Sequence, residues 1–185
     1  VGKNMTAVKI KDDVIIFDAG LYLPAIVAIE EKDRKIPYSE KRLRDLGALP
    51  DDLVLEKLGW KDKVRAIVIG HAHLDHVGAV PYLAHRYPKA DIYGTPFTIA
   101  VLEYILEDEK IPLKNRRRIV HPDSSITIRG KSGDYKIDFV NITHSTLQCS
   151  ILALHTSEGI ITYALDFKLD NHPLIDNTPN YKKLR

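Results

Sequence analysis

The sequence predicts an α/β layered sandwich. Short β-branched strands open the chain, helical segments follow, and a second run of strands closes it. The chain has 185 residues, of which 44% are hydrophobic and 28% charged, enough for one domain with a substantial core. No repeat, low-complexity tract or linker interrupts this order. We therefore expect one domain of mixed sheets with flanking helices.

The first half of the chain predicts strands that alternate with helices. Residues 6–11 alternate in polarity and residues 14–17 are apolar, which predicts a β-hairpin turning at Asp12-Asp13. Residues 21–60 are less regular, with a charged stretch at 30–44 and a short helix at 50–58, and we expect a surface flap over the site here. The next predicted elements are a strand at 64–69, a helix at 77–86, a strand at 91–93 and a helix from Thr95-Pro96 to Glu109.

The second half predicts four strands separated by glycine-containing turns, at residues 125–129, 135–142, 149–155 and 160–165. The single cysteine, Cys149, opens an apolar run, so we interpret it as a core residue; one cysteine excludes an internal disulfide and favours a reducing compartment. The net charge of +2 demands no polyanionic partner. With no membrane-length apolar stretch and no signal peptide, we expect a cytoplasmic protein without membrane association.

Three histidines and an aspartate fall within six residues, directly after the predicted strand 64–69. Because alternate residues of extended backbone point the same way, His71 and His73 can face one metal ion together. Asp75 and His76 fall at the start of the next helix and face a different point, so two adjacent metal sites are favoured over one. Nitrogen and oxygen ligands suit Zn²⁺ best, with Mn²⁺ as an alternative. The other histidines are interpreted as ordinary core or surface residues, namely His85, His121, His155 and His172.

Three more candidate ligands follow predicted strands. His144 and Asp166 each follow a strand of the second half, and Asp18 follows the second strand of the hairpin. Strand ends that converge are where α/β sheets place their sites, so we interpret His144 and Asp166 as ligands. An ordinary loop histidine and a turn aspartate are the alternatives. Asp18 is either a ligand or a carboxylate that supports the ligands.

These motifs together resemble a known superfamily. The segment Gly70–Ala79, with its spacing to His144 and Asp166, resembles the signature of the metallo-β-lactamase superfamily. Within that superfamily the chain is most similar to the β-CASP ribonucleases, in particular the RNase J-like enzymes of archaea. The stretches that carry this likeness are Gly2–Thr6, Thr143-His144-Ser145 and Leu165–Asp170.

The resemblance implies an αββα sandwich with two zinc ions in a complete site. It implies that one ion is held by His71, His73 and His144, the other by Asp75 and His76, with Asp166 bridging the pair and Asp18 orienting the ligand loops. It implies hydrolysis of single-stranded RNA at phosphodiester bonds, as a 5′ exonuclease, an endonuclease or both, with Asp75 and Asp166 as catalytic residues. Two divalent ions can activate a water and stabilise phosphodiester oxygens during such a displacement.

The resemblance also implies that residues 1–185 are a partial catalytic domain. The β-CASP insert and the C-terminal portion would lie outside this chain, and a homodimer would form in the longer protein. We expect the 185 residues to fold alone with little or no ribonuclease activity. A basic run, Lys114, Arg116, Arg117 and Arg118, is either a solvated charged helix end or a contact for RNA backbone.

Two other functions are weighed against RNA cleavage. The same scaffold and ligands can hydrolyse a small thioester, lactone or β-lactam, because fold and metal ligands do not choose the substrate. The stretch Asp166–Asp170 argues against this function. A non-catalytic homologue would act as an RNA-binding or scaffolding subunit, but a scaffold needs no complete set of ligands.

Overall fold

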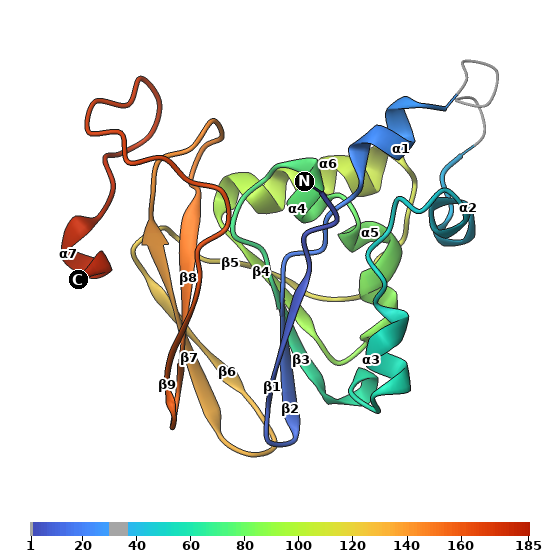
Figure 1. Cartoon of the computed structure of the whole chain (residues 1–185), viewed down its shortest axis with the longest axis horizontal. Coiled ribbons are helices and arrows are strands. Elements are labelled where there is room, and N and C mark those ends of the chain that lie inside the picture. The colour runs from blue at the N-terminus through green and yellow to red at the C-terminus, as the bar shows by residue number, and fades with distance from the viewer. Residues whose placement is uncertain (1, 30–36) are drawn as a thin grey trace.

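The computed structural model describes residues 2–29 and 37–185, which form two β-sheets packed face to face with helices outside the first sheet (Figure 1). The first sheet has the order β1-β2-β3-β4-β5, with β1 antiparallel to β2 and the other neighbours parallel. Its strands are β1 (Thr6–Ile10), β2 (Asp13–Phe17), β3 (Val64–Val68), β4 (Asp91–Gly94) and β5 (Arg117–Ile119).

The second sheet is antiparallel throughout and has the order β6-β7-β8-β9. Its strands are β6 (Ser125–Arg129), β7 (Asp134–Asn141), β8 (Ser150–Thr156) and β9 (Gly159–Tyr163). The helices are α1 (Leu23–Val27), α2 (Glu40–Asp45), α3 (Leu53–Lys57), α4 (Leu74–Val77), α5 (Val80–Leu83), α6 (Pro96–Asp108) and α7 (Tyr181–Leu184). Short 3₁₀ turns occupy Lys61–Lys63 and Ala84–Arg86.

Strand β2 shows how the two faces of the first sheet are used. Val14 and Ile16 pack in the core under the helices, whereas Ile15 and Phe17 pack in the core between the sheets. A strand buried on both faces reads as a continuous apolar run, and each fully buried side chain contributes about 1.5–3 kcal/mol. The outer face of the second sheet carries α7, whose Leu184 lies beside residues of β7, β8 and β9. The predicted αββα-type sandwich with flanking helices is confirmed, with one mixed and one antiparallel sheet.

All eight strands predicted from the sequence are present with ends within two residues, but the helix predicted at 77–86 is not one continuous helix. It begins earlier, at Leu74, and is broken into α4, α5 and a 3₁₀ turn. Gly78 ends α4 in tight contact with another segment, since an added Cβ would lie 2.9 Å from a methyl carbon of Leu21. Pro81 has no amide hydrogen and so falls in the first turn of the next helix.

The other corrections concern the less regular segments. The predicted flap at 21–60 falls partly on residues 30–36, which lie outside the described residues. Leu43 of α2 and Leu55 of α3 are buried in the core under the helices, so these two helices are not a flap. Strand β5 was not predicted at all. Among the described residues, no helix combines the length and the apolar character needed to cross a membrane.

Candidate metal centre

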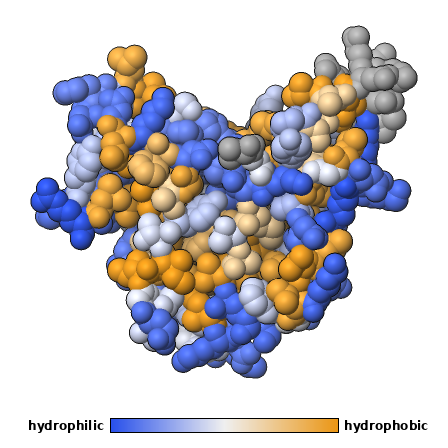
Figure 2. Space-filling model, viewed as in Figure 1, coloured by the Kyte–Doolittle hydropathy of each residue, from blue (hydrophilic) through white to orange (hydrophobic). Residues whose placement is uncertain are grey.

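The candidate centre lies where the strands of both sheets end. Chain leaving β3 passes through Gly70, whose N–H donates to the Asp18 carboxylate at 2.9 Å and whose carbonyl accepts from the Ser150 N–H at 3.0 Å. The backbone of Gly70 therefore links the first sheet to the second just before His71. The space-filling view shows a hollow at this end of the molecule, between α1 and the C-terminal segment (Figure 2).

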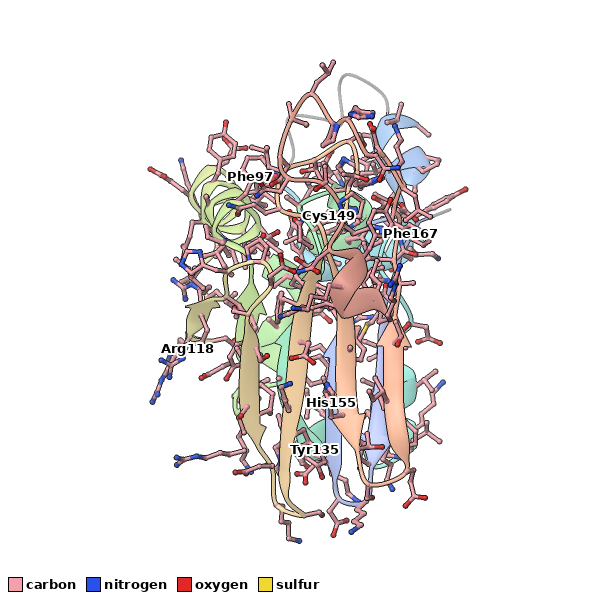
Figure 3. The ribbon with its side chains drawn as sticks, turned by 90° about the vertical axis from the view of Figure 1, so that its left-hand side faces the viewer. Phe97, Arg118, Tyr135, Cys149, His155 and Phe167 are labelled. Atoms are coloured by element: carbon pink, nitrogen blue, oxygen red, sulfur yellow. The ribbon has the colours of Figure 1, made fainter. Side chains whose placement is uncertain are left out.

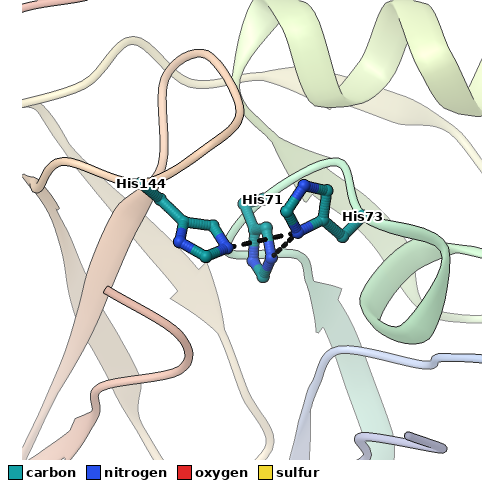
Figure 4. Close-up of side chains that lie close together, drawn as sticks. All are labelled: His71, His73 and His144. Carbon is teal, nitrogen blue, oxygen red and sulfur yellow. Dashed lines mark hydrogen bonds between the residues drawn. The ribbon is translucent and has the colours of Figure 1, made fainter. Parts of the chain in front are cut away.

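Three imidazoles converge at this end of the sheets (Figure 4). His73 Nδ1 lies 3.2 Å from His71 Nε2 and 3.2 Å from His144 Nε2. Nitrogens bound to one tetrahedral zinc at about 2.0–2.1 Å are about 3.3 Å apart, so these separations match those around a shared ion. His144 comes from the loop after β7, so the second sheet supplies the third nitrogen.

The protonation state of these rings suits metal binding. Burial, aided by the neighbouring His76 and His73, lowers the pKa of His71 to about 2. Burial and the charge of His73 also lower the pKa of His144. Both rings are therefore neutral at neutral pH, which is the form that ligates a metal. Their outer Nδ1 atoms are buried without a partner among the described residues. One buried and two half-buried imidazoles that face one another with their ring nitrogens fit a cation at their centre.

A second group of ligand atoms adjoins the first. His76 Nε2 lies 3.4 Å from the Asp166 carboxylate and 3.8 Å from the Asp75 carboxylate. His71, His76 and Asp166 offer ligand atoms within 4.8 Å of one another, so the two groups share His71. Asp166 does not directly follow β9 as predicted, because β9 ends at Tyr163.

The segment after β9 is held against the His144 loop. Lys168 N–H donates to the Thr143 carbonyl at 2.7 Å, and the Thr143 hydroxyl donates to the Lys168 carbonyl at 2.6 Å. The backbone at Leu165 adopts a positive φ of 42°, which turns the chain after the strand. These contacts bring Asp166 beside the histidines although it lies outside the strand.

Asp18 fixes the orientation of His76. Its Oδ2 lies 2.6 Å from His76 Nδ1, and both side chains are buried. The Asn4 amide donates toward His76 Nε2 at 3.1 Å, which requires a lone pair there, so Nδ1 carries the proton donated to Asp18. Burial lowers the pKa of His76, but the hydrogen bond and charge of Asp18 outweigh it and raise this pKa overall. Asp18 thus contacts a candidate ligand, which is consistent with the supporting role, one of the two roles that the sequence left open for it.

Sequence reasoning gave no role to Asn4 or Gly20, which both lie against the segment that carries Asp75. Asn4 Nδ2 donates to the Asp75 carbonyl at 3.0 Å and lies 3.3 Å from its Oδ2. A Cβ at Gly20 would lie 1.5 Å from the Asp75 carbonyl oxygen, so only glycine fits there. The signal for Asn4 was present in the stretch Gly2–Thr6, which resembled the β-CASP ribonucleases without indicating a role.

The basic run does not join the centre and does not form a helix end. Arg117 donates to the carbonyls of Leu113 and Asn115 and pairs with Glu103 at 2.7 Å, so its guanidinium is engaged within the fold. The other three residues line a separate groove on the molecule. Cys149 is buried, as expected, and burial raises the pKa of its thiol. His155 pairs with Asp138 at 2.6 Å, away from the centre.

Comparison with models of known protein families identifies the family of this chain. A model described as the metallo-beta-lactamase superfamily matches residues 1–144. The chain belongs to this superfamily. The matched residues include the whole histidine cluster and end at His144.

Known proteins similar to the chain agree with this assignment. It is 38% identical over 186 residues to Ribonuclease J of Methanocaldococcus jannaschii and 40% identical over 192 residues to Ribonuclease J of Pyrococcus abyssi. Each match covers 100% of this chain and 40% of the relative, so the chain spans about two fifths of their length. A subclass B3 metallo-beta-lactamase of Bradyrhizobium japonicum shares the fold, with a TM-score of 0.54 over 96% of this chain and 61% of that chain at 17% identity.

Proposed function

We propose that this chain carries the metal centre of a hydrolase that cleaves RNA phosphodiester bonds. The observation that carries the proposal is the pair of adjoining ligand groups, which share His71 and are built from both sheets. Whole-chain similarity to proteins named Ribonuclease J supports RNA as the substrate class. Because the chain spans 40% of these relatives, we propose that the residues that clamp RNA lie in further sequence.

The donor set fits two divalent ions, with zinc proposed and Mn²⁺ as the alternative. His71, His73 and His144 would hold one ion. Asp75, His76 and Asp166, in which both carboxylates lie near His76 Nε2, would hold the other. When bound, such ions supply an electrophilic centre for a phosphodiester oxygen and lower the pKa of water.

The residues of the chain have separable roles in this chemistry. Asp18 holds the proton of His76 on Nδ1 and so keeps the Nε2 lone pair directed into the centre. Asn4 holds the carboxylate and the backbone of Asp75 in place. The Asp166 side chain is 47% exposed, so its carboxylate stands on the solvent side where substrate approaches. We propose that one of the two carboxylates, Asp75 or Asp166, accepts the single proton that the attacking water loses, while the other orients that water.

The finer features belong to the same proposal. They are cleavage as a 5′ exonuclease, an endonuclease or both, a homodimer of the longer protein and a location in the cytoplasm. They are supported by the likeness of Gly2–Thr6, Thr143–Ser145 and Leu165–Asp170 to the β-CASP ribonucleases.

The test is cleavage of a labelled single-stranded RNA by the longest natural form of the protein that contains these residues. Asp75→Ala and His76→Ala should each abolish cleavage while the fold is retained, whereas His155→Ala should leave it unchanged because this histidine pairs with Asp138 instead. Wild-type turnover by either centre variant at matched metal loading would refute the two-metal assignment.

Substrate class is tested on the same samples. Hydrolysis of a thioester, lactone or β-lactam without RNA cleavage would replace the ribonuclease by a small-molecule hydrolase. RNA binding with neither metal nor hydrolysis would indicate a scaffold. The 185-residue chain alone should show little or no cleavage, since positioning by the remaining sequence can account for about 7–11 kcal/mol of a catalysed barrier.

A further inference from the structure

A groove of about 710 Å³ lies at the edge of the fold, separate from the metal centre. Four stretches of chain form it: the start of β3, the segment that leads into β4, the loop and strand at β5, and the end of β6. Six cationic side chains and one carboxylate line it: Arg65, Lys89, Lys114, Arg116, Arg118, Arg129 and Asp91. We call this the cationic groove.

Strand directions place the cationic groove far from the histidines. Arg129 pairs with Asp134 at the first residue of β7, whereas His144 follows the last residue of that strand. A strand of eight residues is about 26 Å long, so the two sites lie near opposite ends of the sheet. Figure 3 shows Arg118 pointing outward from the edge strand, lower on the molecule than Cys149 and Phe167, which lie at the end of the metal centre.

Most of the positive charge in the groove is unpaired. Arg65 pairs with Asp13 at 2.5 Å and Arg118 pairs with Asp91 at 3.1 Å. The other four cations have no carboxylate partner among residues 2–29 and 37–185, and all four are exposed, namely Lys89, Lys114, Arg116 and Arg129. The lining has a net charge of +5 against +2 for the whole chain, so the other residues together carry −3. The positive charge is therefore concentrated here although the chain as a whole is nearly neutral.

We propose that the cationic groove binds the phosphodiester backbone of a single RNA strand, as a second contact surface for the substrate of the proposed function. The cations are spread along separate stretches of chain, and all but Arg65 are exposed, which suits an extended polyanion rather than one enclosed phosphate. Tyr93 is the single aromatic residue of the lining and is half-buried in the sheet, so the groove offers little surface for stacking bases. Contact is thus made to phosphates and carries no base sequence.

This proposal revises the role of the basic run. Arg117 is excluded from the surface because its guanidinium binds Glu103 and two backbone carbonyls. Lys89 and Arg129 take its place, although they lie 25 residues before and 15 residues after Lys114 in the sequence. Only the pairing of β4 with β5, and the packing of the second sheet beside them, brings these charges together.

Binding of a fluorescent 20-nucleotide RNA, measured by anisotropy in EDTA, tests the groove without any cleavage. The groove variant replaces Lys89, Lys114, Arg116 and Arg129 by glutamine. Each phosphate contact contributes about 0.7 to the slope of log affinity against log salt for single strands, so the variant should lower the slope by up to about 3. In the wild type, the part of the slope that the four side chains contribute corresponds to about a 50-fold loss of affinity between 50 and 200 mM salt. The melting temperature should not change, because the four side chains are exposed and unpaired.

The matched control replaces four exposed lysines outside the groove by glutamine, namely Lys11, Lys41, Lys57 and Lys182. It makes the same change in net charge and should keep the wild-type slope. An equal loss in both variants, or no RNA binding by the wild-type chain, would overturn the proposal. Inorganic phosphate should displace a 4-nucleotide RNA more easily than a 20-nucleotide RNA. Equal displacement of the two RNAs would also overturn the proposal, because the site would then bind a small anion.

A metal-centre variant separates this proposal from the proposed function. His71→Ala with His73→Ala should keep the RNA affinity and salt slope of the wild type, since neither residue lines the groove. In the longest natural form of the protein, loss of cleavage by that variant with RNA binding intact would support both proposals. Loss of RNA binding in the groove variant, in which the metal centre is intact, would support the groove proposal by itself. This result would hold whether or not the longer protein proves to be a nuclease.

Discussion

Replacing Asp18 by alanine should destabilise the metal-free protein and weaken its metal centre. The carboxylate is fully buried and accepts from the Gly70 N–H at 2.9 Å and from His76 Nδ1 at 2.6 Å. A buried polar group left without a partner costs about 1–3 kcal/mol, so losing both bonds should lower the free energy of unfolding by about 2–6 kcal/mol. Urea unfolding in EDTA measures this quantity directly.

Asp18→Asn tests the charge with little change in shape. The amide oxygen can still accept from Gly70 N–H, but the negative charge that raises the pKa of His76 is lost. Loss of such an orienting carboxylate typically weakens metal affinity 10–100-fold, which zinc titration calorimetry would detect. Asp138→Asn is the matched control, because Asp138 also contacts a histidine, His155, at 2.6 Å but lies away from the centre. Equal zinc affinities for the two variants, or Asp18→Ala within about 0.5 kcal/mol of wild type, would refute the reasoning.

Three further variants test other parts of the fold and the centre. Gly20→Ala should cost about 3 kcal/mol or more in urea unfolding, since its Cβ would overlap the Asp75 carbonyl; near-neutral behaviour would show that this contact is loose. Asn4→Ala should leave the Asp75 carbonyl without its side-chain donor and reduce the affinity for a second metal equivalent about tenfold, with the first unchanged in calorimetry. Burial raises the pKa of Asp13, but hydrogen bonds from backbone N–H groups and Arg65 outweigh this effect and lower the pKa to about 2 overall. Its contribution of about 2 kcal/mol is therefore present above pH 4 and lost as the pH falls from about 4 to 2, and Asp13→Asn should remove this dependence from unfolding free energies measured across that range.

The strands and the histidine cluster could be predicted because their signals are local. Residues 14–17 of β2 and 66–68 of β3 are buried on both faces and therefore read as apolar runs. The cluster His71–His76 places four candidate metal ligands within six residues shortly after a strand, so the sequence alone indicates a metal site. The structure places His144 in one of the two adjoining groups of ligand atoms and Asp166 in the other.

What could not be predicted depends on contacts between distant segments. Asn4 reaches Asp75 across 71 residues, and Gly20 is required only because the Asp75 carbonyl lies against it. The break in the predicted helix reflects the contact between Gly78 and Leu21. Strand β5 is charged and three residues long, and it forms because β4 offers a parallel edge. Local hydrophobic periodicity contains none of this information.

The metal centre is tested most directly by locating zinc in crystals of this chain with diffraction data collected at the zinc absorption edge. We predict an anomalous peak bonded to His71 Nε2, His73 Nδ1 and His144 Nε2 at about 2.0–2.1 Å, and its loss in His73→Ala. A second, weaker peak is expected between His76 and Asp166. Crystals grown in saturating zinc with no peak among the three imidazoles, or with zinc bound only elsewhere, would contradict the assignment of this centre.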